Sequence, residues 1–352
     1  MTSTQCVLIA DDLTGACDAA APFAASGLST VVPLTAETPA ADVVSFSTDS
    51  RDVKPAEARR RLAAIAPQVR SLAPRVVFKK IDSTLRGNTG HEIVAALDAF
   101  GCDATVVNPA FPATGRIVVA GHLLAGDGSF RPIQMSTFLE GHGAKGCRHT
   151  PPGAIAFVID EGIRFLSMEA ERDADLDEIA EELLAIERPI LWAGSAGLAG
   201  ALARRIAGPR RPRPEAAATG PVLFCIGSDH KLTVAQQRRL LAVRDVAVQP
   251  GALSEGRHVL LRLPWGKLEA EEVRAMLTPC RPAAIVLSGG DTASLVCRAL
   301  SVEAIEIHGE LWPGVPVGTL RGGAYDGLSV VTKSGGFGNP DTLVDIADYY
   351  HG

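Results

Sequence analysis

The sequence is poor in aromatic residues and has no long basic segment. Phe, Trp and Tyr make up 5% of its 352 residues, and 34 Lys and Arg residues face 40 Asp and Glu residues, which gives a formal net charge of -6. Surfaces that bind nucleic acid are typically basic. The composition therefore argues against a nucleic-acid partner.

We also expect neither a membrane-spanning segment nor a secretory leader. No apolar run approaches the roughly 20 residues that span a bilayer, and the start, MTSTQCVLIADD, has no basic region before its short apolar run. The seven cysteines are odd in number and form no C-x-x-C pair, which is typical of reduced thiols. We therefore expect a cytoplasmic protein that does not bind membranes.

What the sequence does contain is a regular alternation of strand-like and helix-like patterns. Apolar runs at residues 6–10 and 222–227, and at the start of residues 104–112, alternate with amphipathic runs such as residues 55–72 and 233–243. This alternation predicts an α/β fold with mostly parallel sheets covered by helices.

The length of the chain exceeds what one core usually supports, so we expect two domains. The best linker is residues 208–221, GPRRPRPEAAATGP, which is rich in Pro and Gly and has no apolar pattern. The expected division is an N-terminal domain over residues 1–207, the linker 208–221, and a C-terminal domain over residues 222–352.

Two local expectations concern the N-terminal domain. The helix expected at residues 89–101 begins with the pattern of a capping box, from Thr89 to Glu92. Residues 121–152 are rich in Gly, His and Pro, and they are predicted to form a loop that includes a short hairpin at most.

Polar clusters follow several of the predicted strands, where ligands of open α/β sheets bind. The first is Asp11-Asp12, two adjacent carboxylates after a buried strand. Carboxylates so close together resist burial unless a cation or a proton compensates them. Asp is also a good helix cap, so a purely structural role for one of the pair is an open alternative.

The second cluster lies in FKKIDSTLRGNTG, after the strand that ends near residue 80. Lys and Arg beside hydroxyl and amide donors suit a carboxylate or a phosphate, although a solvated charged loop would have similar composition. Asn108, which begins NPAFPATGR, could hydrogen-bond a hydroxylated ligand or shape a proline turn. The candidate substrate-binding residues are Lys80, Asp82, Ser83, Arg86, Asn88 and Asn108.

Three glycine loops in the C-terminal domain each join a strand to a helix. Glycine lets backbone N–H groups approach phosphate oxygens, and helix N-termini attract anions. One such loop is weak evidence, but three in one domain indicate a nucleotide phosphate site. The candidate residues are Gly227, Ser228, Gly289, Gly290, Asp291, Thr292, Lys333, Gly335 and Gly336. No P-loop motif is present, and no metal ligands are assigned with the spacing of a standard site.

Taken in order, these motifs resemble the four-carbon acid sugar kinase family. The resemblance covers nearly the whole chain through seven ordered segments. The matching segments are Ala10–Ala16, Lys80–Asn88, Asn108–Arg116, Gly194–Ala203, Gly227–Gln236, Ser288–Thr292 and Lys333–Gly338.

The resemblance implies two α/β domains, with an acid sugar on the N-terminal one, ATP on the C-terminal one, and both ligands in the cleft between them. It implies phosphorylation of the terminal hydroxyl of threonate, erythronate, 3-oxo-tetronate or 3-oxo-isoapionate, with ATP and Mg²⁺ as cofactors. A homodimer is a separate expectation, because apolar helices such as Ser195–Ile206 could pack against a partner.

In this reading Asp11 or Asp12 orients or deprotonates the acceptor hydroxyl or helps to hold Mg²⁺.

Two other classes of protein stay open. A non-enzymatic sensor of nucleotides or sugar acids would bind without turnover, and a phosphatase would release phosphate without ATP. The adjacent aspartates do not fit the D-x-D-x-T spacing of one phosphatase class.

Overall fold

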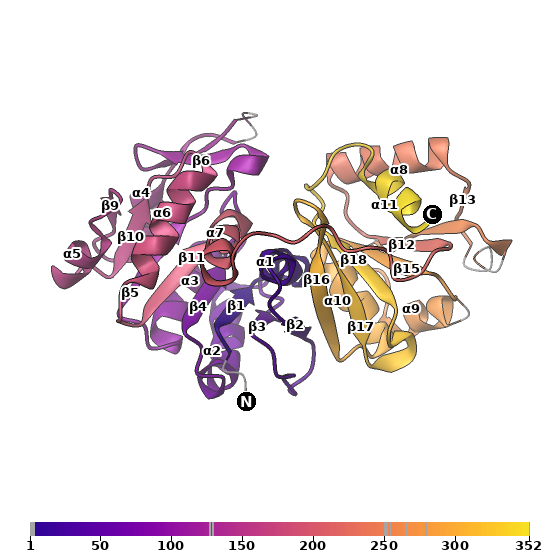
Figure 1. The fold of residues 1–352 in the computed structure, drawn as a ribbon, viewed down its shortest axis with the longest axis horizontal. Coiled ribbons are helices and arrows are strands. Elements are labelled where there is room, and N and C mark those ends of the chain that lie inside the picture. The colour runs from indigo at the N-terminus through magenta and orange to yellow at the C-terminus, as the bar shows by residue number, and fades with distance from the viewer. Residues whose placement is uncertain are drawn as a thin grey trace. The chain divides into compact units, whose positions relative to one another are not determined.

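The chain folds into two compact units, each described separately here (Figure 1). This computed structural model describes residues 4–351 except residues 127, 129, 250–252, 254, 265 and 279. Unit 1 comprises Met1–Ser29 and Ala40–Arg210, and unit 2 comprises Thr30–Pro39 and Arg211–Gly352. The boundary between Arg210 and Arg211 falls inside the expected linker. The contiguous division drawn from the sequence did not anticipate that Thr30–Pro39 lies in unit 2.

Unit 1 is built on a fully parallel sheet. Its strands, in spatial order, are β3 (Val43–Ser47), β1 (Cys6–Ala10), β4 (Val76–Lys80), β11 (Ile190–Gly194), β5 (Ala104–Asn108), β10 (Phe165–Met168) and β9 (Arg148–Thr150). Every residue of β1, β5 and β11 is buried, as expected for strands covered on both faces.

The helices of unit 1 form two packed groups. Helix α7 (Ala196–Ala207) packs against both α1 (Leu13–Ala25) and α6 (Asp173–Leu184), and α2 (Pro55–Ser71) packs against α3 (Thr89–Ala99). A further short helix, α5 (Ile155–Asp160), precedes β10. The predicted class, α/β with mostly parallel sheets, is confirmed.

The prediction of a loop with at most a short hairpin over residues 121–152 was wrong for residues 135–141, which form a helix, and for residues 148–150, which form a strand. A small antiparallel sheet contains β6 (Arg116–Val119), β7 (His122–Ala125) and β8 (Ile133–Gln134), and it is followed by helix α4 (Met135–Gly141) and strand β9. Such short elements show few turns of periodicity, so their pattern is weak in the sequence.

Unit 2 has a sheet with a parallel part and an antiparallel part. In spatial order its strands are β13 (Val246–Ala247), β14 (His258–Arg262), β12 (Val222–Ile226), β15 (Ala284–Ser288), β18 (Ser329–Lys333), β17 (Val315–Arg321), β16 (Ala304–Trp312) and β2 (Thr30–Pro33). Pairing is parallel from β13 to β18 and antiparallel from β18 through β17 and β16 to β2.

The helices of unit 2 also pack in pairs, α8 (Lys231–Val243) with α11 (Thr342–His351) and α9 (Ala270–Leu277) with α10 (Gly290–Leu300). One core cluster includes Phe224 and Tyr350, both with no exposed surface. None of the helices in the described part of the chain combines the length and apolar character that a bilayer crossing requires.

The expected capping box at the start of α3 was wrong. The N-cap of α3 is Asn88, which makes no side-chain capping bond. Glu92 instead points into the core, where its carboxylate lies 3.0 Å from Lys79 Nζ and accepts from the Ser50 hydroxyl. Both members of the Lys79–Glu92 pair are 1% exposed. The pair therefore links β4 to α3 inside unit 1.

Removing one member of this pair should destabilise the protein strongly, because it leaves a buried charge without a partner. We expect Glu92→Gln to lower the free energy of unfolding by about 3 kcal/mol, measured by urea denaturation. The double variant Lys79→Met/Glu92→Leu should lose clearly less. A Glu92→Gln protein within about 0.5 kcal/mol of wild type would contradict this account.

Candidate functional site

The two adjacent aspartates at the end of β1 share one arginine. Arg51 donates from Nε to Asp11 Oδ2 at 2.8 Å and from a terminal nitrogen to Asp11 Oδ1 at 2.7 Å, and its other terminal nitrogen donates to Asp12 Oδ2. A planar guanidinium suits this fork of contacts better than an ammonium does. Arg51 thus supplies the cation that the paired carboxylates require.

Arg51 leaves the two aspartates with different proton affinities. Burial raises the pKa of Asp11, but the guanidinium of Arg51 outweighs this effect and holds it below its usual range. Burial, together with the negative charge of Asp11, raises the pKa of Asp12 despite Arg51. Asp12 is therefore the better proton acceptor of the pair.

Asp12 also caps helix α1, so the structural role expected for one aspartate of the pair is observed here. Its Oδ1 accepts the Gly15 N–H and lies 3.3 Å from the Thr14 hydroxyl oxygen. A Cβ at position 15 would lie 2.7 Å from that carboxylate oxygen, so glycine permits the close approach. The cap fixes the Asp12 side chain at the carboxyl end of β1.

Sequence reasoning missed Arg51, which lies in the loop after β3. Asn88 holds this loop by donating from Nδ2 to the carbonyl oxygens of Ser50 and Val53, both at 2.8 Å. A Cβ on Gly87, whose φ is +70°, would lie 2.9 Å from Arg51 Cγ. The signal that could have found Arg51 is its place just beyond the carboxyl end of a strand.

Lys80, at the carboxyl end of β4, is 5% exposed. The carboxylate of Asp18 lies 3.7 Å from its Nζ, which is too far for a hydrogen bond. Within the described residues Lys80 Nζ makes no hydrogen bond. A buried ammonium in this condition has unused donors for an anionic ligand.

Asp82 and Arg86 pair with each other beside Lys80. Asp82 accepts from Arg86 at 2.6 and 3.2 Å and from the Thr84 N–H at 2.8 Å. Burial opposes ionisation of Asp82, but Arg86, Arg51 and Thr84 together hold its pKa well below the usual range. The Arg86 side chain is 64% exposed, and Ser83 next to it is half-buried.

Both predicted asparagines bind backbone in this structure. Asn108 donates from Nδ2 to the Met168 carbonyl at 3.1 Å and accepts the Ala110 N–H at 2.9 Å. Asn88 holds the Arg51 loop as described above. Direct contact of these two amides with a substrate stays a prediction, whereas their positioning of the surrounding loops is observed.

The three glycine loops of unit 2 meet at the carboxyl ends of β12, β15 and β18. The Gly289 N–H donates to the Lys333 carbonyl at 3.0 Å, and the Gly227 N–H donates to the Ser288 carbonyl at 3.2 Å. A Cβ on Gly335 would collide with the Ser228 hydroxyl, and a Cβ on Gly227 would collide with that of Thr292. The predicted nucleotide residues are thus brought together, and glycine is what lets them pack.

Helix α10 begins in this cluster with no side-chain cap. Its N-cap is Gly289, which has a φ of +107°, and the first turn holds the exposed Asp291 and the buried Thr292. Backbone N–H groups at an uncapped helix start can hydrogen-bond an anion. The 11-residue helix adds a favourable dipole for a phosphate group.

Lys333 lies beneath the last glycine loop. It has no exposed surface, and its Nζ donates to the Ser334 carbonyl at 2.9 Å, the Phe337 carbonyl at 3.3 Å and Thr233 Oγ1 at 3.4 Å. Burial lowers the pKa of Lys333 from 10.5 to about 7. Its observed role is to hold the loop, and contact with a nucleotide stays a prediction.

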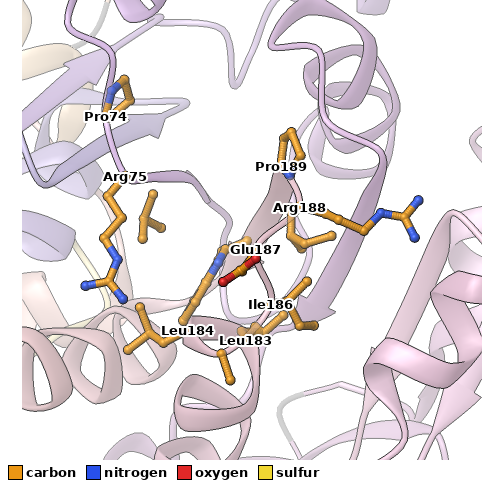
Figure 2. Close-up of a pocket in the computed structure, with 12 residues that line it drawn as sticks. Pro74, Arg75, Leu183, Leu184, Ile186, Glu187, Arg188 and Pro189 are labelled. Carbon is orange, nitrogen blue, oxygen red and sulfur yellow. The ribbon is translucent and has the colours of Figure 1, made fainter.

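A cavity of about 630 Å³ in unit 1 lies elsewhere (Figure 2). Its lining includes Arg75 and Pro189, just before β4 and β11 begin, so it opens at the opposite ends of these strands from Lys80. Figure 2 shows Arg188 extending away from Glu187, and Arg188 is paired with Asp103 and Asp160. The cavity is therefore separate from the predicted site.

Comparison with known proteins matches one segment in each unit of the chain. Residues 6–150 match a family model described as a sugar-binding N-terminal domain, and residues 266–343 match one described as a nucleotide-binding C-terminal domain. The polar strand ends lie in or beside the first match, and the loops at Gly289 and Lys333 lie in the second. Fold and site thus define a two-domain sugar kinase.

Individual relatives identify the family within this class. A D-threonate kinase of Bordetella bronchiseptica is 32% identical and covers 97% of this chain and 96% of its own length. A D-erythronate kinase of Heliobacterium modesticaldum is 27% identical with the same two coverages. The chain belongs to the four-carbon acid sugar kinase family.

A solved structure from Bordetella bronchiseptica is 31% identical, covers 99% of each chain and superposes with a TM-score of 0.53. It is described as a domain of unknown function with bound citrate, in a domain-swapped dimer.

The buried Lys333 should make stability depend on pH. Its folded-state pKa lies below the unfolded one, so between about pH 7 and pH 10 the unfolded chain binds the extra proton, and stability rises with pH. Relative to Lys333→Met, wild type should gain about 3 kcal/mol between pH 7 and pH 9.5, measured by urea denaturation. If Lys333→Met gained as much stability as wild type over this pH range, the assignment would be contradicted. Lys267→Met, at an exposed lysine of the same unit, serves as the control.

Proposed function

We propose that this kinase transfers the γ-phosphoryl group of ATP to the terminal hydroxyl of a four-carbon sugar acid of the threonate or erythronate type. The proposal that the substrate is an acid rests on Lys80. This residue is a buried ammonium with unused hydrogen-bond donors at the carboxyl end of β4. A substrate carboxylate would supply the acceptors that Lys80 lacks. The exposed Arg86 is near enough in sequence to act as a second cation for the same ligand.

We assign to Asp12 the role of the base that accepts the proton of the substrate's acceptor hydroxyl. Its raised pKa favours proton uptake, and its contacts with Arg51 and Gly15 fix its orientation. Asp11 accepts two hydrogen bonds from Arg51 and stays ionised, so its role is to hold the guanidinium in place. A positioned base beside the acceptor is a recurring part of phosphoryl-transfer sites.

We assign the nucleotide phosphates to the loops that meet at the start of α10. Backbone N–H groups from Gly290 onward, together with the hydroxyl groups of Ser228 and Thr292, would bind phosphate oxygens there. Lys333 and Gln236 support this arrangement from below, since Gln236 donates to the carbonyl oxygens of Phe337 and Asn339 at 3.1 and 2.8 Å.

The side chains at the proposed phosphate site fit a magnesium ion that binds together with the nucleotide. No group of three or more His, Cys, Asp or Glu side chains among the described residues could hold a metal, and both oxygens of Asp11 accept from Arg51. Mg²⁺ usually binds through one or two carboxylates plus phosphates. Asp291 is the acidic side chain at the proposed phosphate site, and the bound ion would neutralise charge on the transferred group.

A homodimer is the assembly that we propose for this kinase. It follows the description of the Bordetella structure as a domain-swapped dimer.

The first experiment measures ATP consumption with Mg²⁺ against D-threonate, D-erythronate, L-threonate, their 3-oxo forms and 3-oxo-isoapionate. We expect turnover of at least one acid, and Lys80→Met should raise its KM roughly 10- to 100-fold with little change in the KM for ATP. Lys54→Met, at an exposed lysine of the same unit, is the control. Binding of ATP and acid without any turnover would instead support a sensor.

Asp12→Asn should fold normally, because asparagine is also a good N-cap, but it removes the base. We expect kcat to fall by roughly 10²- to 10⁴-fold, measured by the same assay with an unchanged circular dichroism spectrum. Asp52→Asn makes the same charge change at an exposed site beside Arg51 and should keep its activity. Full activity of Asp12→Asn would end the role of Asp12 as the base.

A further inference from the structure

The loop between β12 and α8 places two hydrogen-bond acceptors beside the proposed phosphate site. In this loop Ser228 lies against two of the glycine loops, because a Cβ on Gly335 would collide with its hydroxyl oxygen and a Cβ on Gly289 would lie 3.5 Å from its backbone nitrogen. The acceptors are the Ser228 carbonyl and the exposed carboxylate of Asp229, the next residue. Either of them would repel a phosphate oxygen that it faced.

One arginine binds both of these acceptors. Arg262, at the carboxyl end of β14, donates from one terminal nitrogen to Asp229 Oδ1 at 2.6 Å and from the other to the Ser228 carbonyl at 3.1 Å. The second nitrogen also lies 3.4 Å from Gln237 Oε1. Strand β14 pairs with β12, with Arg262 opposite Ile226. The guanidinium therefore holds the carbonyl and the carboxylate toward β14, which its planar fork of donors permits.

The other polar groups of the loop are donors, as a phosphate requires. The Ser228 hydroxyl oxygen accepts the His230 N–H at 3.3 Å, which leaves the hydroxyl hydrogen able to donate. Helix α10 begins next to this loop at Gly289, without a side-chain cap. A phosphate bound here would meet hydroxyl and N–H donors while Arg262 occupies the two acceptors.

The charge of Asp229 needs compensation at this position. ATP is an anion, and the site already holds Asp291, which we assign to Mg²⁺. Lys333 donates only to neutral acceptors beneath the loop. Among the described residues, Arg262 is the cation that pairs with Asp229. Without it, the carboxylate would oppose the nucleotide.

We propose that Arg262 is a positioning residue for the nucleotide. By binding the Ser228 carbonyl and the Asp229 carboxylate, it neutralises the loop and leaves the donors of the loop to the phosphates of ATP. The proposal rests on the nucleotide site proposed above and adds a residue that acts through the loop. Removal of Arg262 leaves an uncompensated negative charge beside ATP, and removal of the Asp229 charge as well relieves most of that repulsion. Loss of a purely structural contact would show no such rescue.

The test compares Arg262→Met, Asp229→Asn and the double variant in the full-length protein. Arg262→Met should raise the Kd for ATP about 10-fold by calorimetry, and the KM for ATP in parallel, with kcat and the KM for the acid within about twofold of wild type. Asp229→Asn should bind ATP at least as tightly as wild type. The double variant should return to within about threefold of the wild-type Kd. Because the repulsion is electrostatic, the Arg262→Met defect should shrink when KCl is raised from about 50 to about 500 mM.

Arg257→Met is the matched control. Arg257 immediately precedes β14, at the opposite end of this strand from Arg262, and pairs with Asp245 at 2.6 Å. Its side chain is 39% exposed, and that of Arg262 is 37% exposed. Arg257→Met should leave ATP binding unchanged. Both arginine variants should keep the wild-type midpoint in urea denaturation, because exposed ion pairs add little to stability.

Three results would overturn the role of Arg262: ATP binding by Arg262→Met as tight as that of wild type, an equal loss in Arg257→Met, or a double variant no better than Arg262→Met. Turnover of the acids is measured on the same preparations. Turnover by wild type together with any of these results would leave the kinase proposal standing. The expected pattern of ATP binding in a protein without turnover would reject the kinase proposal and keep the role of Arg262. A wild-type protein that binds no ATP would overturn both.

Discussion

The candidate site of unit 1 depends on one arginine held between two adjacent carboxylates. Without Arg51, Asp11 and Asp12 would be two like charges buried side by side, and one of them would take up a proton. With Arg51 in place, Asp11 stays ionised while the pKa of Asp12 rises. The same contact therefore stabilises the site and differentiates the two aspartates.

Other polar residues and glycines of these motifs position the backbone of the surrounding loops. Asn88 holds the loop that carries Arg51, and Gly87 leaves room for its side chain. Across the sheet, Asn108 shapes the loop after β5, and the Ser195 hydroxyl donates to the Ala110 carbonyl there. Many polar side chains of these motifs thus hydrogen-bond to the backbone and position it. Few groups are left to bind a ligand, and Lys80 is the foremost of them.

The two units use glycine and lysine in different ways. In unit 2, glycines let three loops pack against the hydroxyl groups of Ser228 and Thr292. Lys333 is buried beneath these loops with only neutral acceptors, whereas Lys79 in unit 1 pairs with Glu92. Burial lowers the pKa of Lys333 to about 7, because no carboxylate contact compensates that burial.

The sequence by itself determined the α/β class, the main strands of the parallel sheets and the clustering of the candidate site residues at strand ends. These features follow from local periodicity, and the carboxyl ends of parallel strands necessarily share one edge. Tertiary structure decided the partners: Arg51 for the aspartates, Glu92 for Lys79 and not for a helix cap, and unit 2 for Thr30–Pro39. Such pairings join segments far apart in the chain, and only the packing of the folded units brings them together.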